Sequence, residues 1–349
     1  LVLSENEVKA VASAEGASGG TATLPPIYPE WLGDRAFSAT HGARFNYVVG
    51  EMARGIATPR MVVEAVRAGC LGFYGSAGLS LDEIERGLRE IKAGLSDAQN
   101  SWGANLIHTP QQPGYEADVV DLFLREGVRR VSASAYMRLS PEIVRYTALG
   151  LQSGPNGAII RTNHVFAKVS RAEIAEQFLA PAPEAILNAL VVSGAISAEQ
   201  AQMAAQVPVA AEITAEADSG GHTDRRAAAP LFTSICAARD RIASKTGIDP
   251  DTIRIGLAGG IATPHAVAAA FSMGAAYVLT GSINQAAVES GLSLPGRQLL
   301  AKASPADVAM APAADMFEQG VEVQVLKRGT LFAMRGKKLF QFYRSGAAF

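Results

Sequence analysis

Short apolar runs alternate with longer amphipathic segments over most of the chain, and this alternation predicts repeated strand–helix units. Eight runs have the length of strands: 46–51, 70–74, 103–107, 129–133, 158–162 or 165–169, 209–214, 253–258 and 276–280. Strands that alternate with helices form parallel sheets. The regular spacing favours a closed (βα)8 TIM barrel over the alternative, an open doubly wound sheet.

One five-residue motif, Gly-Ile-Ala-Thr-Pro, occurs at 55–59 and again at 260–264. Each copy precedes a helical pattern that ends at a glycine, Gly69 or Gly274. Threonine as N-cap, proline in the first turn and glycine past the end are typical helix boundaries. Three serines are followed three residues later by Glu or Gln and therefore predict capping boxes: Ser80, Ser170 and Ser197.

The interval between the fifth and sixth predicted strands is too long for one connecting helix, because it holds two helical patterns, 185–192 and 198–205. We expect a helical insertion on the catalytic face, as a lid or substrate subdomain. The predicted divisions are a flexible leader (1–26), a barrel in two parts (27–170 and 208–320), the insertion (171–207) and a basic C-terminal extension (321–349).

Composition excludes several classes of protein. The 349 residues carry 31 basic and 33 acidic side chains, a net charge of −2, which argues against the basic surface that a nucleic-acid-binding protein needs. Two cysteines, Cys70 and Cys236, are too few for a disulfide framework or a thiolate zinc site, and they fit a reducing cytoplasm. No stretch has the pattern of a membrane span or a secretory signal.

Glycine-rich turns follow the last two predicted strands. Gly259 and Gly260 come after the seventh strand, and Gly281 and Ser282 come after the eighth. Glycine lets backbone N–H groups approach a phosphate, and barrels often bind phosphate after strands seven and eight. The alternative is that these glycines only form tight turns. Two such turns at successive strand ends favour the phosphate site.

A Gly-Gly-His turn at 220–222 follows the sixth predicted strand. An imidazole there would lie over the barrel mouth, where it can donate or accept a proton near neutral pH, so His222 is the predicted catalytic residue. Glu212, Glu216, Asp218 and Asp224 surround it in sequence, and a divalent metal site is an alternative. Histidine spacings typical of zinc enzymes are absent, and no metal is predicted.

Asn105 and Lys168 close the third and fifth predicted strands, where their side chains would point into the mouth. An amide could bond the edge of a heterocycle and a cation could stabilise a reduced, anionic ring; the alternative is two ordinary solvated strand ends. From 323 to 349 the chain has six basic residues and no acidic one. Such a block is usually a solvated face, and it could also receive an acidic carrier protein or a nucleotide phosphate.

The chain resembles the FMN barrels related to nitronate monooxygenase, in the segments 52–56, 68–75, 103–106, 220–222, 258–261 and 280–282. Within that superfamily, 216–224, 281–285, 310–317 and 325–332 resemble the trans-acting enoyl reductases of polyketide and polyunsaturated fatty acid synthases. The resemblance extends from about Leu32 to Tyr343. Nitronate monooxygenases have Glu-Ala-Gly-Gly-His, whereas here Asp218 and Ser219 intervene, which favours the reductases.

This resemblance implies FMN at the barrel mouth, NADPH as its reductant, and hydride transfer to the β-carbon of an enoyl thioester on an acyl carrier protein. His222 matches the family histidine beside the flavin and would polarise the thioester carbonyl or protonate the α-carbon. Alternatives are a nitronate monooxygenase and a non-catalytic barrel that docks carrier proteins. We also allow for a homodimer, without a nucleic-acid or membrane partner. Family-like positions for FMN are Met52, Ala53, Asn105, Lys168, Gly221, Gly259, Gly260, Gly281 and Ser282.

Overall fold

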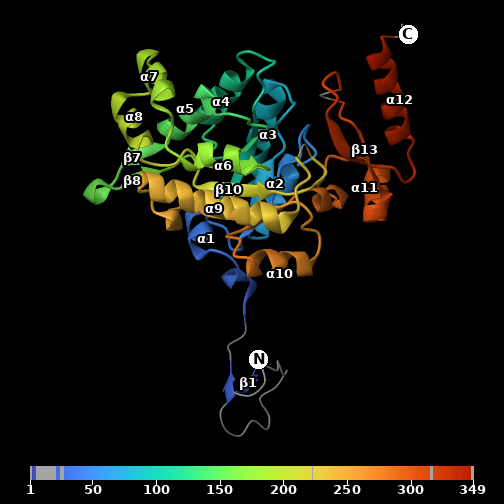
Figure 1. Cartoon of the computed structure of the whole chain (residues 1–349), viewed down its shortest axis with the longest axis horizontal. Coiled ribbons are helices and arrows are strands. Elements are labelled where there is room, and N and C mark those ends of the chain that lie inside the picture. Colours follow the sequence, from blue (N-terminus) through green and yellow to red (C-terminus); the bar gives the residue numbers. More distant parts are fainter. Residues whose placement is uncertain are drawn as a thin grey trace.

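A computed structural model describes residues 2–4, 21–23, 27–96, 98–221, 223–314 and 317–346 (Figure 1). Eight parallel strands close into a barrel, and the last strand pairs with the first. This confirms the predicted TIM barrel. Its strands are β3 (Tyr47–Val49), β4 (Leu71–Tyr74), β5 (Trp102–Ile107), β6 (Arg130–Ser134), β9 (His164–Val169), β10 (Glu212–Glu216), β11 (Arg254–Ala258) and β12 (Val278–Thr280).

Helices follow the strands and surround the barrel: α2 (Pro59–Arg67), α3 (Leu81–Gly94), α4 (Tyr115–Arg125), α5 (Pro141–Leu149), α6 (Ala172–Leu179), α9 (Ala228–Thr246) and α10 (Pro264–Ser272). Thr58 and Thr263 cap the two helices of the repeated motif. Ser80 and Ser197 complete their predicted capping boxes. Ser170 does not, because α6 begins one residue later than expected and the Ser170 hydroxyl donates to Asp224.

The barrel interior is filled by aromatic rings near its N-terminal end. α1 (Arg35–His41) covers this end, and its Phe37 stacks on Tyr277 with ring centroids 4.5 Å apart. Phe73 and Phe166 pack edge to face at 5.0 Å below them. Gly256 on β11 has to be small, because a Cβ there would lie 2.3 Å from the Tyr277 ring. The packed interior leaves the opposite, C-terminal end as the place for a site.

The helical insertion is α7 (Glu184–Val192) and α8 (Ala198–Ala204), and it lies between the fifth and sixth barrel strands as predicted. The expected catalytic-face lid is wrong, however. The pair follows α6 and leads into β10, so it lies at the N-terminal ends of the strands. There Glu199 of α8 accepts a hydrogen bond from Ser153 in the hairpin of β7 (Leu151–Ser153) and β8 (Ile159–Arg161). The alternative strand 158–162 belongs to this hairpin, outside the barrel.

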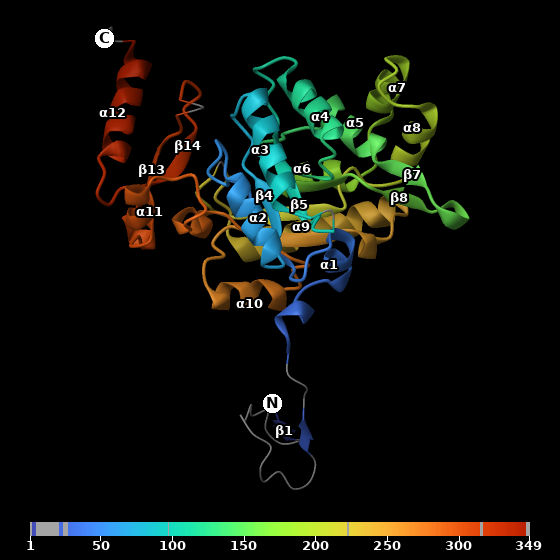
Figure 2. The same cartoon turned by 180° about the vertical axis from the view of Figure 1, so that it is seen from behind.

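The C-terminal part forms a separate layer beyond the opposite end of the barrel (Figures 1 and 2). α11 (Leu294–Leu300) leads to the antiparallel hairpin β13 (Val308–Pro312) and β14 (Glu322–Leu326), on which α12 (Phe332–Ser345) packs. This layer begins before the predicted boundary at residue 321, because β13 pairs with β14. The hairpin and α7–α8 thus stand at opposite ends of the molecule.

The seam of the barrel is reinforced beyond the β12–β3 pairing. The Thr58 hydroxyl donates to the Glu289 carbonyl at 2.5 Å, and the Gly291 N–H donates to the Ile56 carbonyl at 2.9 Å. A Cβ on Gly291 would lie 2.4 Å from the Gly55 carbonyl oxygen, so this contact requires glycine. The first copy of the repeated motif, residues 55–59, therefore binds the segment that follows the last barrel strand, at residues 289 and 291.

Most of the predicted leader lies outside the described residues; within it, β1 (Val2–Ser4) pairs with β2 (Thr21–Thr23). Among the described helices, none combines the length and the apolar character that a membrane crossing needs. Cys70 and Cys236 are both free thiols.

Candidate active site at the barrel mouth

The structure brings the predicted cofactor residues to one end of the barrel. Each belongs to a barrel strand or to the loop at a strand's C-terminal end: Met52 and Ala53 after β3, Asn105 on β5, Lys168 on β9, Gly221 after β10, Gly259 and Gly260 after β11, and Gly281 and Ser282 after β12. His222, the predicted catalytic residue, lies outside the described residues. We refer to this end of the barrel as the mouth.

The glycine turns after β10, β11 and β12 meet one another. A Cβ on Gly259 would lie 2.5 Å from the Ala217 carbonyl oxygen, and one on Gly220 would lie 3.0 Å from Oγ of Ser282. Around Gly260 and Gly281, by contrast, the space that a Cβ would occupy is open. Gly260 also has a positive φ of 71°, which favours glycine. The turns therefore interlock on one side and leave backbone accessible on the other.

A buried ion pair spans the mouth. Nζ of Lys168 lies 2.8 Å from Oε1 of Glu51, which follows β3 on the opposite side of the barrel, and 3.2 Å from Oε1 of Glu216 at the end of β10. The Glu51 side chain is 3% exposed. Burial alone would lower the pKa of Lys168, but Glu216 and Glu51 outweigh it and raise the pKa above its usual range. Lys168 is therefore a fixed cation.

Polar side chains of three adjacent strands line the other side of the mouth. Asn105 donates through Nδ2 to the Ser132 carbonyl and to Oγ of Ser134, both at 2.9 Å, and Ser76 donates to the Asn105 carbonyl at 2.7 Å. Oε2 of Glu51 and Oγ of Ser132 are buried and find no hydrogen-bond partner among the described residues. Buried polar atoms are normally paired, so these two mark places where a ligand or water would bond.

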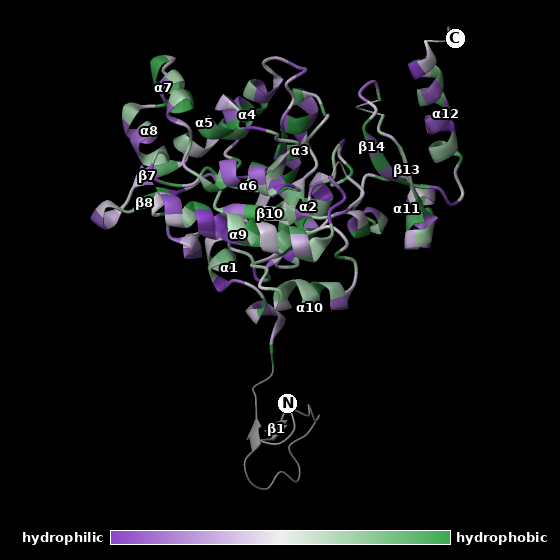
Figure 3. Cartoon of the chain, viewed as in Figure 1, coloured by the Kyte–Doolittle hydropathy of each residue, from purple (hydrophilic) through white to green (hydrophobic). Residues whose placement is uncertain are grey.

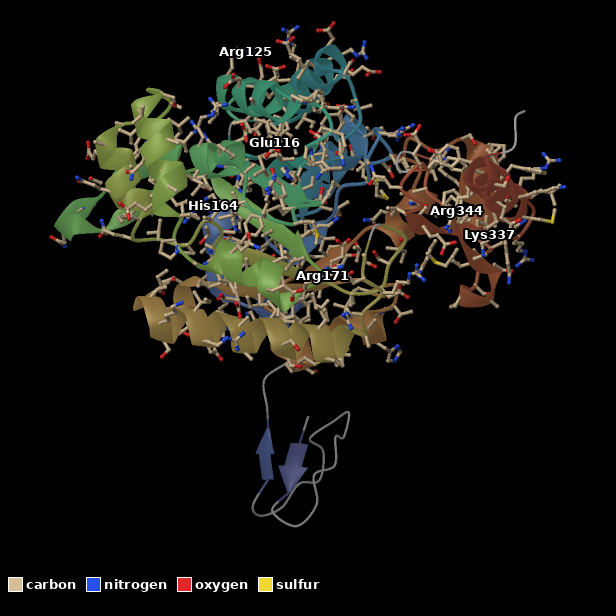
Figure 4. All side chains as sticks on the ribbon, turned by 45° about the horizontal axis from the view of Figure 1, so that its top comes forward. Glu116, Arg125, His164, Arg171, Lys337 and Arg344 are labelled. Atoms are coloured by element: carbon tan, nitrogen blue, oxygen red, sulfur yellow. The ribbon has the colours of Figure 1, made fainter. Side chains whose placement is uncertain are left out.

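The loop after β10 is anchored to the loop after β9. The Asp224 carboxylate accepts two hydrogen bonds of 2.6 Å from Arg171, which Figure 4 labels, and one of 2.6 Å from Ser170. Arg171, followed by Ser170, lowers the pKa of Asp224 to about 2. We call these three residues the Asp224 clip. It holds the loop that carries the Gly-Gly-His turn.

The carboxylates of the alternative metal site, including Asp224 of the clip, are paired with other side chains. Asp224 is bonded to Arg171, Glu216 to Lys168, and Asp218 to Gln324 of β14 at 2.9 Å. Glu212 begins β10, at the end of the barrel away from the mouth. The carboxylates that are close in sequence are thus drawn apart and paired with other side chains.

A second buried network closes the N-terminal end. Glu212 bonds to His41 at 3.1 Å and to Arg254, and Arg130 donates to Nδ1 of His41 at 3.1 Å. His41, His164 and Glu212 are, within the described part of the chain, the one trio that could hold a metal ion. Two arginines already bond this trio, however, and their positive charge opposes a cation. We therefore interpret it as structural.

Glu116 forms a third cluster, between two loops of the mouth (Figure 4). Its carboxylate accepts from Tyr136 at 2.7 Å, from Ser140 and from Nδ1 of His108 at 2.8 Å. Burial and Glu116 raise the pKa of Tyr136 well above its usual value, so it stays a donor. The cluster ties the loop after β5 to the loop after β6.

Sequence reasoning missed Glu51 as a site residue. The signal was available, because Glu51 follows an apolar strand just as Asn105 and Lys168 end theirs. Its pairing with Lys168 could not be read from sequence, since the two residues are on opposite strands. Glu116 and His108 gave no comparable signal.

No family model matches the chain. The solved enoyl reductase domain of MlnA, from the macrolactin biosynthesis cluster of Bacillus amyloliquefaciens, is 38% identical with a TM-score of 0.86, and the match covers 90% of this chain and 71% of that one. The chain belongs to the family of this enoyl reductase domain. The predicted resemblance to the enoyl reductases is thereby confirmed.

The curated relatives of this enoyl reductase family member are named for polyunsaturated fatty acid synthesis and for polyketide biosynthesis. The chain is 44% identical over 328 residues to a polyunsaturated fatty acid synthase polypeptide of Thraustochytrium sp., and 43% identical over 318 residues to the polyketide biosynthesis protein PksE of Bacillus subtilis. These matches cover 94% and 91% of this chain but only 22% and 41% of the relatives.

Proposed function

We propose that the chain is a trans-acting enoyl reductase of polyketide or polyunsaturated fatty acid biosynthesis, with FMN as cofactor and NADPH as reductant. Overall, one hydride from NADPH and one proton convert the α,β-double bond of an acyl-carrier-bound thioester to a single bond. FMN, when bound, supplies a ring that accepts hydride from one partner and gives it to the other. The family membership supports the reaction class. The interlocked glycine turns carry the assignment of the cofactor.

The residues at the mouth fit FMN. The open space at Gly260 and Gly281 leaves backbone N–H groups accessible to a phosphate, which a Cβ would hinder. Gly259 and Ser282 hold these turns against their neighbours. The unpartnered Oε2 of Glu51 offers an acceptor for a cofactor N–H or hydroxyl group.

The other predicted positions have distinct roles in this proposal. Lys168, kept charged by Glu51 and Glu216, would supply a cation to a reduced, anionic ring held at the mouth. Asn105 donates both of its N–H groups to Ser132 and Ser134, so its Oδ1 would bond the ring edge. Met52, Ala53 and Gly221 would line the cofactor. His222 holds the proton that reaches the α-carbon, or donates a hydrogen bond to the thioester oxygen as negative charge develops there.

Gly260→Asp tests the cofactor site. We expect loss of bound flavin, because the variant places charge and bulk beside the phosphate. The control is Gly247→Asp, because Gly247 also has a positive φ, 77°, and open space around its Cβ position, but it ends α9 away from the mouth. The measurement is FMN affinity from the quenching of flavin fluorescence. Equal affinity in both variants would place the phosphate elsewhere.

His222→Ala tests the proton donor. We expect FMN affinity to be retained and NADPH-dependent reduction of crotonyl thioester to slow by at least about a hundredfold, the scale of general acid catalysis. His265→Ala, on the exposed start of α10, is the control and should react like the wild type. Unchanged turnover in His222→Ala would remove this histidine from the mechanism, while turnover of nitronate but not enoyl thioester would overturn the reductase itself.

A further inference from the structure

α12 leaves large apolar side chains in solvent on the side that faces away from its hairpin. Its inner side packs on the hairpin, where the ring centroids of Phe340 and Phe317 are 5.4 Å apart. On the outer side Met334 is 63% exposed and Phe342 47% exposed, and Leu331 just before the helix is 53% exposed. Phe332, Leu339 and Tyr343 are 49%, 45% and 45% exposed as well, so large apolar side chains reach solvent around much of the helix. Exposed apolar side chains that lie together typically mark an interaction surface.

Basic side chains share this face. Positions 331, 334, 335, 338 and 342 have the spacing of one helical face. This face combines the apolar residues Leu331, Met334 and Phe342 with the basic residues Arg335 and Lys338. Nζ of Lys338 lies 5.9 Å from the centre of the Phe342 ring. Figure 3 shows this mixture of hydrophilic and hydrophobic residues along α12. We call these five residues the α12 surface.

The charge of the α12 surface is unbalanced. Lys337 and Arg344 add to it from the same helix (Figure 4), and 323–346 contains no acidic residue. The ion pairs of the C-terminal part, as far as the structure describes it, are Arg225–Glu322 and Arg328–Asp307, and neither involves Arg335, Lys338, Lys337 or Arg344. The surface is therefore suited to an acidic partner.

The α12 surface lies at the same end of the molecule as the mouth. The hairpin that carries α12 bonds to the loop after β10, through Gln324 to Asp218 at 2.9 Å and through Glu322 to Arg225 at 3.7 Å. The hairpin lies between α12 and this loop (Figures 1 and 2), so a partner seated on α12 would be at the mouth end of the molecule and would reach the loop past the hairpin.

We propose that the α12 surface docks the acidic, helical acyl carrier protein that presents the enoyl thioester; the identity of this partner rests on the proposed function. Carboxylates of the carrier would pair with Arg335 and Lys338, and its apolar side chains would cover Met334 and Phe342. A second copy of this chain fits less well, because a two-fold contact would set one basic surface against another. The attraction is between exposed charges, so it weakens with salt.

Lys338→Glu tests this surface, with Lys245→Glu as the matched control. Both lysines are exposed on helices and both variants change the net charge equally, but Lys245 is on α9. Two substrates are compared, crotonyl-acyl carrier protein and the small crotonyl-N-acetylcysteamine thioester. For Lys338→Glu we expect KM for the carrier-bound substrate to rise about tenfold, equivalent to about 1.4 kcal/mol, and KM for the small thioester to stay unchanged. The control should change neither.

Direct binding separates this proposal from the proposed function. Fluorescence anisotropy of labelled holo-acyl carrier protein, without substrate, should show salt-sensitive binding that Lys338→Glu weakens and Lys338→Gln weakens less. If neither thioester is reduced but this binding persists, the reductase fails and the docking surface stands. If both thioesters are reduced and the variants bind the carrier like the wild type, the docking surface is wrong. Dimers that Lys338→Glu dissociates, or binding to anionic vesicles in place of the carrier, would equally overturn it.

Discussion

His164 begins β9 and faces the carboxylate of Glu212, with 3.9 Å between its Nδ1 and Oε2 of Glu212. Burial lowers the pKa of His164 to about 3, and it also lowers the pKa of His41. Burial alone would raise the pKa of Glu212, but His41 and Arg254 outweigh it and hold the carboxylate ionised. These side chains therefore keep one protonation state over a wide range of pH, as expected for a framework at the end of the barrel away from the mouth.

Because the pKa of His164 is lowered in the folded chain, the protein should become less stable as the pH is lowered. Below pH 6.5 the unfolded chain protonates this histidine, while the folded chain does so only near pH 3. The unfolding free energy should therefore fall as pH is lowered through this window, by up to about 1.4 kcal/mol per pH unit for one histidine. Urea unfolding at several pH values measures this slope.

His164→Gln should reduce that slope, and His265→Gln should not, because His265 is exposed on α10. Some slope should remain in His164→Gln, since the pKa of His41 is lowered as well. Identical slopes in the wild type and in His164→Gln would contradict this account of the buried network.

At the scale of elements, polar contacts of Asp218, Asp224 and Arg225 hold the connection from β10 to α9 in place. The Asp224 clip fixes it to the loop after β9, and Asp218 is fixed by Gln324 of β14. Loops with few buried contacts open more readily than the strands they join. The order of this loop thus depends on charged contacts that are partly exposed.

Asp224→Asn should loosen this loop. The variant removes the charge that strengthens the bonds from Arg171 and Ser170, so amide hydrogen exchange should become faster in peptides that cover 217–227. Asp240→Asn is the control, because Asp240 pairs with the neighbouring Arg239 on the outside of α9. The pKa of Asp224, lowered to about 2, keeps the clip charged in the wild type, and its contribution to stability is lost only as pH falls from 3.8 towards 2. Unchanged exchange would mean that packing, not the clip, orders the loop.

Patterns of neighbouring residues predicted the helices and strands well. They could not predict contacts between residues that are far apart in the sequence. The capping boxes at Ser80 and Ser197 depend on neighbours three residues away and were confirmed. Ser170 carries the same signal, but Asp224, far along the chain, takes its hydroxyl. In the same way Lys168 was predicted at the mouth, whereas its partners Glu51 and Glu216 became visible only once the barrel had closed.

At the scale of the whole molecule, the two ends of the barrel differ: one is a stabilising framework, and the other carries the candidate site. Charged networks and α7–α8 stabilise one end, while glycine turns, Lys168 and the β13–β14 hairpin surround the other. The lid was misplaced because the sequence shows that an insertion exists between two strands, but not whether it precedes or follows the barrel helix between them. α6 occupies the usual place after β9, so the two extra helices were displaced to the far end.

The seam between β12 and β3 has a consequence for how the polypeptide is made. β3 leaves the ribosome before the other barrel strands, and its second neighbour, together with Glu289 and Gly291, emerges only after all of them. Until then the sheet of the nascent chain is open and has two bare strand edges, β3 and β11, which are the kind of surface that chaperones shield from aggregation. Translation of the final barrel unit is therefore the step that completes the ring.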